Sequence, residues 1–491
     1  MKHKFLFILL FSLVLEGMVT TQAVAGDYVH QVNTLIGTKG TGLTSGYLYP
    51  GATYPYGMVQ FTPSYFSKRS GFVINQLSGG GCEHMGNFPT FPVKGKLKMS
   101  PDNILNYRIN VSEEKGHAGY YEAMVQEDIK AKLTVTERTG MASYEYPADQ
   151  QYGTIIIGGG ISATPIEQAA IVITAPNKCE GYAEGGNFCG LRTPYKVYFV
   201  AEFDTDAFET GTWKREELMP NTTFAEGEYS GVYFTFDVNK KKNIQYKIGV
   251  SYVSVENARE NLKAENAEWD FQKIQNQAEA KWNHYLGMIE VEGTNPDRTT
   301  QFYTHLYRSF IHPNVCSDVN GEYMGADFRV HKSRSKHYTS FSNWDTYRTQ
   351  IQLLSMLDPE VASDIVISHQ LFAEQSGGSF PRWVMANIET GVMQGDPTPI
   401  LIANAYAFGA RNYDPKPIFK IMRKGAEEPG SKSQDVETRP GLKQYLDKGY
   451  YNASIQLEYT SADFAIGQFA LHAVGAVSYT HLRAHETPEH L

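Results

Sequence analysis

The sequence predicts two domains of different class: an N-terminal β-sandwich followed by a truncated (α/α)6 toroid. Up to about residue 256, short runs that alternate apolar and polar residues are separated by Gly, Asn and Pro turns. From residue 297 on, apolar residues recur at helical spacing, and Pro and Gly separate the runs. Strands followed by helices indicate two domains, because each class buries its own apolar faces.

Residues 1–25 are predicted to be a secretion signal. Lys2 and Lys4 precede an apolar run, Phe5–Leu15, that is too short to cross a bilayer. Ala23–Ala25 has the small-x-small pattern of a cleavage site. We therefore expect an exported protein without a transmembrane segment in the mature chain, located in the periplasm or at the cell surface.

Composition excludes one class of partner. The chain has 491 residues and a formal net charge of −9, whereas nucleic-acid binding needs clustered Lys and Arg. At roughly 150 residues per domain, this length predicts two or three domains. We expect a monomer that binds no nucleic acid.

Residues 27–256 are assigned to the sandwich. Within the predicted strand Tyr195–Asp204, Val197, Phe199, Ala201 and Phe203 alternate with more polar residues. Three further strands are predicted at Thr154–Ile157, Val232–Phe236 and Tyr246–Val253.

Residues 257–296 are predicted to be a helical linker. A helix is expected over Asn257–Leu286, which contains no Gly or Pro, and a short strand over Met288–Val291.

Residues 297–473 are assigned to a partial (α/α)6 domain. After a helix around Phe302, Leu306 and Phe310, the predicted helices are Thr346–Leu357, Glu360–Gln375, Pro399–Phe408, Pro417–Glu427, Gly441–Asp447 and Ile455–His472. A toroid of six helix pairs needs about 12 helices, so we expect only part of one. Residues 474–491 lack the preceding periodicity and are predicted to be an unrelated tail.

The four cysteines leave two alternatives open. Cys179 and Cys189 are close in sequence and could close a small loop by a disulfide. Alternatively, Cys82, Cys179, Cys189 and Cys316 are buried free thiols. No spacing among them indicates a zinc site.

Two segments combine aromatic and charged side chains. In the run Phe341–Arg348, Trp344 offers a flat apolar face for a sugar ring, and Asp345 a carboxylate for two vicinal hydroxyls. Asp345 could equally be a helix N-cap. In the Gly-rich loop at 377–383, Arg382 and Trp383 are candidates, or Arg382 instead pairs with a structural carboxylate.

Two weaker candidates remain. The glycines of Gly79–Cys82 allow the backbone to approach a ligand closely, although a plain turn also explains them. Glu458 and Asp463, about one turn apart, suggest acid–base chemistry, but helical carboxylates are more often solvated.

Ordered motifs connect these segments from Val32 to His472. They are Tyr49-Pro50-Gly51-Ala52, Pro55-Tyr56-Gly57-Met58-Val59-Gln60, the Gly79–Cys82 loop, the Tyr195–Asp204 strand, Trp282, Ser317-Asp318-Val319-Asn320-Gly321, Trp344–Arg348, Thr390-Gly391-Val392-Met393, Ala405-Tyr406 and Leu457-Glu458-Tyr459. The set resembles glycoside hydrolase family 92, the calcium-dependent, inverting exo-α-mannosidases.

The resemblance implies an active site between the sandwich and the barrel. It implies that these residues bind substrate: Trp344, Asp345, Gly80, Gly81, Cys82, Arg382 and Trp383. The family's acid, in a Glu-Gly-Asn stretch, and its base, in an Asn-Asp-Asp-like stretch, have no counterpart here. We expect both, with the main Ca²⁺ ligands, beyond the end of the chain, which would leave this chain inactive. Glu458 matches a different family position and is not assigned as the acid.

The function implied is release of terminal α-linked mannose from N-glycans or mannans, with α-1,2 linkages preferred, by an inverting Ca²⁺-assisted mechanism. The partner is then a mannose-containing glycan. Two alternatives are a non-catalytic glycan-binding fragment and a peptide-N-glycanase-like amidase that releases the glycan.

Overall fold

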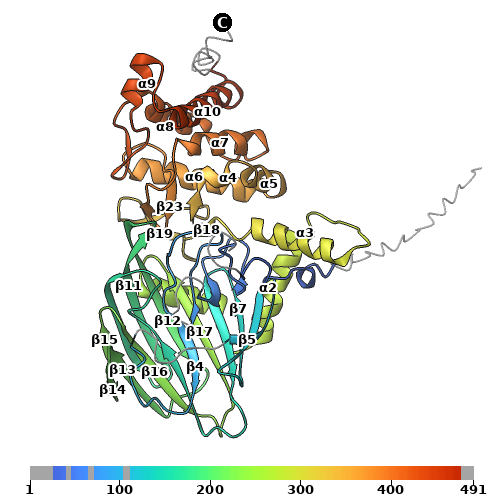
Figure 1. The fold of residues 1–491 in the computed structure, drawn as a ribbon, viewed down its shortest axis with the longest axis vertical. Helices are drawn as coiled ribbons and strands as arrows, with labels where there is room; N and C mark the ends of the chain where they lie inside the picture. Colours follow the sequence, from blue (N-terminus) through green and yellow to red (C-terminus); the bar gives the residue numbers. More distant parts are fainter. Residues whose placement is uncertain (1–25, 40–45, 65–70, 103–110, 477–491) are drawn as a thin grey trace, which may run out of the picture.

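The computed structural model describes residues 26–39, 46–64, 71–102 and 111–476. The predicted signal at 1–25 and most of the predicted tail, from 477 on, lie outside these residues. Figure 1 shows a β-sandwich at one end of the molecule and a helical domain at the other, which confirms the predicted order of the two classes. Among the described helices, none combines the length and apolar character needed to cross a membrane.

The first sheet of the sandwich has eight strands in the order β1-β2-β3-β4-β9-β16-β13-β14. They are β1 (Ala52–Thr53), β2 (Gln60–Pro63), β3 (Phe72–Val73), β4 (Thr90–Lys94), β9 (Tyr152–Ile157), β16 (Ser230–Asp237), β13 (Glu209–Lys214) and β14 (Glu217–Pro220).

The second sheet has nine strands in the order β15-β10-β11-β12-β17-β8-β7-β6-β5. They are β15 (Phe224–Glu226), β10 (Ile166–Ala175), β11 (Lys178–Phe188), β12 (Leu191–Phe203), β17 (Asn243–Ser251), β8 (Thr139–Glu145), β7 (Ile129–Val135), β6 (Tyr120–Val125) and β5 (Val111–His117).

The sandwich core lies between these sheets, as the alternation predicts. Val197, Phe199, Ala201 and Phe203 of β12 are all fully buried, in one cluster with residues of the other sheet such as Phe234. The four predicted strands coincide with β9, β12, β16 and β17. Period-two alternation is reliable here because each inner face packs against a second sheet.

The predicted helix over 257–286 is two helices, α1 (Val255–Glu265) and α2 (Phe271–Leu286). The helix breaks because Asn266 leaves helical geometry and the side chain of Asp270 caps α2 by accepting from the amide of Lys273. α1 packs on β12 and β17, and α2 packs on β7. The predicted strand at Met288–Val291 is wrong, since that segment has no regular structure.

The helical domain contains α3 (Pro296–Ser309), α4 (Asn343–Thr346), α5 (Gln350–Leu357), α6 (Pro359–Gln375), α7 (Pro397–Ala407), α8 (Pro415–Glu427), α9 (Leu442–Lys448) and α10 (Ala453–Phe469), followed by one π-turn, η3 (Ala470–Val474). Short strand pairs lie between the helices: β18 (Asn314–Val315) with β21 (Tyr338–Thr339), β19 (Glu322–Met324) with β20 (Val330–Lys332), and β25 (Lys432–Ser433) with β26 (Val436–Glu437). A three-stranded sheet is formed by β22 (Phe341–Ser342), β23 (Trp383–Met385) and β24 (Ile388–Glu389).

Of the two alternatives for the cysteines, the Cys179–Cys189 bridge does not form, and the free thiols hold only for Cys179 and Cys316. Cys189 is bonded to Cys82 instead, across 107 residues, while Cys179 and Cys316 are buried free thiols. The reason is topological: Cys179 lies inside β11 with its side chain in the sandwich core, whereas Cys189 lies at the turn between β11 and β12. Only the turn reaches the glycine-rich loop.

Candidate functional site

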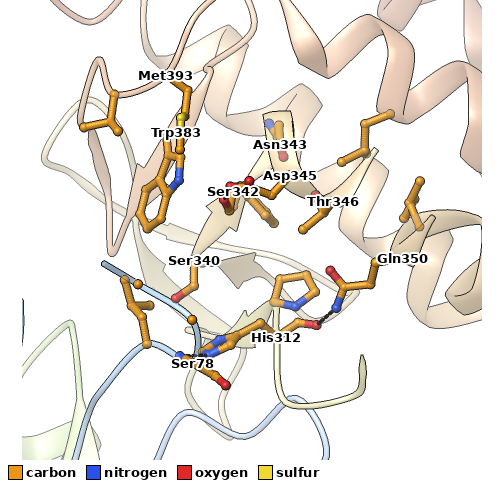
Figure 2. Close-up of a pocket in the computed structure, with 18 of the residues that line it drawn as sticks. Ser78, His312, Ser340, Ser342, Asn343, Asp345, Thr346, Gln350, Trp383 and Met393 are labelled. Atoms are coloured by element: carbon orange, nitrogen blue, oxygen red, sulfur yellow. Dashed lines mark hydrogen bonds between the residues drawn. The ribbon is translucent and has the colours of Figure 1, made fainter. Parts of the chain in front are cut away.

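A cavity of about 660 Å³ lies where the sandwich meets the helical domain. Its size is typical of small-ligand sites, which span about 300–1,000 Å³. The sandwich contributes the glycine-rich loop Leu77–Cys82 and the Phe188–Cys189 turn. Figure 2 shows Trp383 and Met393 on one side, Thr346 and Gln350 on the other, and Ser78 with His312 at the bottom of the view.

His84 fixes the glycine-rich loop. Its Nε2 accepts from the amide of Leu77 at 2.8 Å, and its Nδ1 lies 2.7 Å from the carbonyl oxygen of Cys82. The imidazole must therefore be neutral, with its proton on Nδ1. Burial lowers the pKa of His84 to about 4, which keeps it in this state.

Two glycines of this loop have a specific geometric role. Gly79 has φ +83°, a left-handed conformation that favours glycine. A Cβ on Gly80 would lie 2.9 Å from the ring of His84. Glycine at both positions therefore suits the path of the loop around His84.

His312 joins the loop to the helical domain. Its Nε2 accepts from the amide of Ser78 at 2.8 Å, and its Nδ1 lies 2.6 Å from Oδ1 of Asn314. The side chain of Gln350 donates to the carbonyl oxygen of His312 at 3.0 Å. Desolvation lowers the pKa of His312 to about 4, so that Nε2 remains an acceptor.

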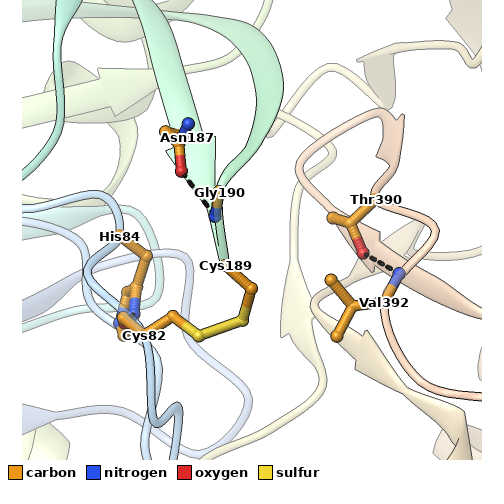
Figure 3. Close-up of a disulfide and its surroundings, with 7 residues drawn as sticks. All are labelled: Cys82, His84, Asn187, Cys189, Gly190, Thr390 and Val392. Carbon is orange, nitrogen blue, oxygen red and sulfur yellow. Dashed lines mark hydrogen bonds between the residues drawn. A yellow bond between two sulfur atoms is a disulfide. The ribbon is translucent and has the colours of Figure 1, made fainter.

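The Cys82–Cys189 disulfide holds the second end of the loop (Figure 3). It places Phe188, which precedes Cys189, against Trp383, with ring centroids 4.5 Å apart. Trp383 is 5% exposed and lines the cavity. One aromatic side chain from each domain thus forms a shared wall.

The β22–β23 strand pair places the aromatic and acidic side chains together. Ser342 is directly opposite Trp383 in this antiparallel pair. The hydroxyl of Ser342 donates to Oδ2 of Asp345, which is exposed and lines the cavity. Asp345 lies in the first turn of α4 and Ser342 is its N-cap residue, so the alternative of Asp345 as N-cap is wrong.

Trp344 is not among the cavity-lining residues, although it is adjacent to Asp345. Its indole Nε1 donates to Oε1 of Glu458 at 3.0 Å, and the guanidinium of Arg348 lies 4.2 Å from its ring centroid. One face of the indole is therefore occupied by Arg348. Glu458, from α10, holds the indole in place and is itself outside the cavity lining.

The structure does not bring Arg382 into the cavity. Its guanidinium donates to the carbonyl oxygens of five residues, Gly391, Met393, Gly395, Glu437 and Thr438, at 3.0–3.3 Å. The buried carboxylate of Glu389 accepts from the amides of Arg382, Trp383 and Gly391. Both side chains hold the backbone around Trp383, so they support the cavity wall from behind.

Two further carboxylates, those of Asp396 and Asp463, form a buried ion cluster with Arg439. Arg439, which is 1% exposed, donates to Asp396 at 2.8 Å and to Asp463 at 2.7 Å. Tyr445 also donates to Asp463, at 3.0 Å. Asp463 and Glu458 therefore do not form a catalytic pair; each is bound to a different structural partner.

Sequence reasoning missed His312, Gln350, Phe188 and Asn343 as contributors to the cavity. His312 and Gln350 lie in segments with no Gly-rich pattern, so no local signal was available for them. Phe188 lies in the Gly-rich stretch Gly185–Gly190, a signal that could have identified it. Asn343 lies inside the Phe341–Arg348 run but was not singled out; its amide donates to Thr398 at 2.7 Å and is buried.

The cavity combines a flat apolar wall, backbone groups of a glycine-rich loop, and few polar side chains. Asp345 is the one carboxylate that lines it within the described part of the chain, and Arg308 the one Lys or Arg side chain. Such a lining suits an uncharged ring with many hydroxyls, because the ring stacks on Trp383 while a carboxylate accepts from paired hydroxyls.

Comparison with known proteins gives one family for both domains. Residues 31–251 match the Glycosyl hydrolase family 92 N-terminal domain, and residues 257–485 match the Glycosyl hydrolase family 92 catalytic domain. An uncharacterized secreted glycosidase from Arthroderma benhamiae is 24% identical over 93% of this chain and 62% of its own length.

Solved structures agree. A family GH92 α-mannosidase from Bacteroides thetaiotaomicron superposes with a TM-score of 0.83 at 25% identity, over 93% of this chain and 64% of that one, and is also known in complex with mannoimidazole. The family GH92 inverting mannosidase from strain VPI-5482 of that species matches at 26% identity, with the same TM-score and coverage. The chain thus spans less than two thirds of the length of these relatives.

Proposed function

This chain belongs to glycosyl hydrolase family 92, and from that membership we propose that the protein acts on glycans that end in α-linked mannose and releases the terminal sugar. The observation that supports this best is the cavity wall in which Trp383 lies opposite Ser342 and Ser342 orients Asp345. Mannose is proposed as the sugar because the related structures are named as mannosidases, one of them in complex with mannoimidazole.

In this proposal, a mannose ring stacks on Trp383, and Asp345 accepts hydrogen bonds from two of its hydroxyls. Gly80, Gly81 and Cys82 contribute backbone groups from the sandwich side. Trp344 and Arg382 act indirectly, Trp344 by packing beside Asp345 and Arg382 by holding the loop behind Trp383. Exo action belongs to the proposal through the family resemblance.

Inverting hydrolysis uses two carboxyl groups about 6.5–9.5 Å apart, one that protonates the leaving oxygen and one that activates water. Asp345 is the single carboxylate in the described lining. We therefore assign Asp345 to sugar binding and no described residue to the acid or base. The same observation favours a second candidate function, mannose binding without turnover by this chain.

Calcium belongs to the proposal through the family resemblance alone. Ca²⁺ takes six to eight oxygen ligands, and the described cavity lining offers one carboxylate. The described residues thus do not form a calcium site at the cavity, and no step is assigned to the ion.

We further propose a monomeric, exported protein with a preference for α-1,2 linkages.

Three measurements test these proposals. Mannobioses with α-1,2, α-1,3 and α-1,6 linkages are incubated with the chain, and free mannose is quantified, while calorimetry measures mannoimidazole binding. Turnover lost in EGTA and restored by Ca²⁺, but not by Zn²⁺, supports the calcium-assisted enzyme. Binding without turnover supports the second candidate. The absence of both mannoimidazole binding and mannose release would contradict both candidate functions. Release of an intact reducing glycan from a glycopeptide would indicate the amidase instead.

A further inference from the structure

A second cluster of ligand-type side chains lies far from the cavity, at the edge of the sandwich beside α2. His30 belongs to a short 3₁₀ helix, η1 (Val29–Gln31), His117 is the last residue of β5, and Glu279 lies in the middle of α2. Their ligand atoms all lie within 4.8 Å of one another, and this is the one such group of three His, Cys, Asp or Glu residues among the described residues. Three distant segments therefore converge on one point.

The N-terminal segment is fixed at this point by Asn283. Its side-chain oxygen accepts from the amides of Tyr28 at 2.9 Å and Val29 at 3.0 Å. Asn283 follows Glu279 by four residues, so the two side chains lie on the same face of α2. The contact that docks η1 onto α2 thus brings His30 beside Glu279.

His117 is positioned independently. Its ring stacks on that of Tyr120, with centroids 5.0 Å apart and planes at 26°, and the ring of His30 lies 4.6 Å away. Nε2 of His117 lies 2.8 Å from Oε1 of Glu279. Gln275, one turn before Glu279 on α2, donates to the same carboxylate oxygen at 2.6 Å. Each of the three side chains is thus held by contacts outside the cluster.

His30 also has an outer partner. Its Nδ1 lies 2.6 Å from Oδ1 of Asp27. When a carboxylate occupies Nδ1, the ring is held in one orientation and Nε2 is left as the electron-pair donor, an arrangement typical of metal-bound histidines. His30 is exposed, which gives an ion access from solvent.

We propose that His30, His117 and Glu279 bind a divalent transition-metal ion of the Zn²⁺ class, with water as a fourth ligand. Two imidazoles and one carboxylate suit Zn²⁺, whereas Ca²⁺ prefers oxygen ligands only. Metal bonds of about 2 Å place tetrahedral ligand atoms about 3.3 Å apart. The widest separation therefore closes by up to about 1.5 Å when the ion binds.

The ion's role follows from the three segments that it joins. It ties the first described residues of the chain to β5 and α2, and its charge compensates the two carboxylates, Asp27 and Glu279, that contact the histidines. This site is separate from the cavity, because none of its residues lines it. Zn²⁺ binding is therefore expected to stabilise the fold and to leave glycan binding unchanged.

The test uses the whole chain without a polyhistidine tag. Isothermal titration with Zn²⁺ is expected to show one ion per chain, and Co²⁺ is expected to give the d–d absorption of a tetrahedral nitrogen–oxygen site. His30→Ala, His117→Ala and Glu279→Gln are each expected to weaken Zn²⁺ binding at least tenfold. His331→Ala is the matched control: His331 pairs with Asp327 at 2.9 Å but belongs to no three-ligand group in the described chain.

Asn283→Ala tests positioning, since it removes no ligand. We expect several-fold weaker Zn²⁺ binding and loss of the Zn²⁺-induced rise in Tm that the unmodified chain shows. His30→Ala and Glu279→Gln keep the test decisive if His117→Ala does not fold, because His30 is exposed and Gln matches the shape of Glu. Absence of Zn²⁺ binding, or binding that all three ligand variants retain, would overturn the proposal.

Discussion

Nε2 of His312 accepts a hydrogen bond from the backbone amide of Ser78, 2.8 Å away and 234 residues earlier in the chain. The donor belongs to the glycine-rich loop of the sandwich, and the acceptor to the segment that follows α3. This bond sets the position of one wall of the cavity relative to the other. The predicted sugar site is therefore shared by two domains, and its geometry depends on their contact.

Replacing His312 by Ala is expected to weaken mannoimidazole binding about three- to tenfold, since loss of one buried hydrogen bond costs about 0.5–1.5 kcal/mol. Calorimetry measures the affinity, and Tm reports the fold. His305→Ala, at an exposed position on α3 outside the cavity lining, is the control and should bind normally. Equal affinities for the two variants would show that the loop contact does not position the site.

Trp383→Leu is expected to lower mannoimidazole affinity at least tenfold, because an aliphatic side chain offers no flat face for a sugar ring. Trp383→Phe keeps an aromatic face against Phe188 and should lose less. Calorimetry measures the affinity of all three proteins, and the expected order is the unmodified chain, then Trp383→Phe, then Trp383→Leu. If Leu and Phe behave alike, stacking on this residue is not what binds the sugar.

Asp345→Asn and Glu458→Gln separate the two carboxylates near Trp344. Asp345 lines the cavity and Glu458 does not. We expect Asp345→Asn to weaken mannoimidazole binding tenfold or more, since hydrogen bonds to charged groups contribute about 1.5–3 kcal/mol. Glu458→Gln should bind normally and lower stability slightly, because its contact with Trp344 persists in neutral form. The reverse ranking would place the sugar on the α10 side instead.

Removing the disulfide as Cys82→Ser with Cys189→Ser is expected to lower the free energy of unfolding by about 2–5 kcal/mol, as is typical when a native disulfide is lost. The bond closes a span of 107 residues. Urea denaturation measures the change. Cys316→Ala is the control, because it removes a buried free thiol and leaves the disulfide intact. It should leave mannoimidazole affinity unchanged, whereas the double variant should lower it.

Acid is expected to destabilise the fold through His84. Burial lowers its pKa from 6.5 to about 4, so between these values the unfolded chain binds a proton that the folded chain does not. The contribution is fully present above about pH 6.5 and is lost as the pH falls toward 4, at up to about 1.4 kcal/mol per pH unit. Urea unfolding measured across this pH range should show that the free energy of unfolding falls less steeply with decreasing pH in His84→Gln. An unchanged pH dependence would mean that His84 is protonated in the folded state.

Much of the fold could be predicted from the sequence because its strands and helices bury one regular face each. Val197, Phe199, Ala201 and Phe203 alternate along β12, and all four lie in the core. The break between α1 and α2 could not be predicted, because the segment contains no Gly or Pro and the two helices are separated by the caps at Asn266 and Asp270. The four cysteines could not be paired, since the loop at Cys82 and the turn at Cys189 become neighbours only when the two sheets face each other.

The site was predictable only in part. Gly80, Gly81, Cys82, Asp345 and Trp383 do meet at one cavity. The guanidinium of Arg382 resembles a ligand-binding group in sequence, but it is saturated by carbonyl oxygens from two loops that no local pattern identifies. Burial, which decides whether a charged group is free or used internally, depends on contacts between distant residues.

The Cys82–Cys189 bond also has a consequence for biosynthesis. Cys82 is synthesised first, and Cys179 leaves the ribosome ten residues before Cys189. An oxidant that acts early can therefore join Cys82 to the wrong thiol. Cys179 becomes inaccessible once β11 pairs with β10 and its side chain enters the core. We therefore expect slow oxidation to give a higher yield of native protein than rapid oxidation.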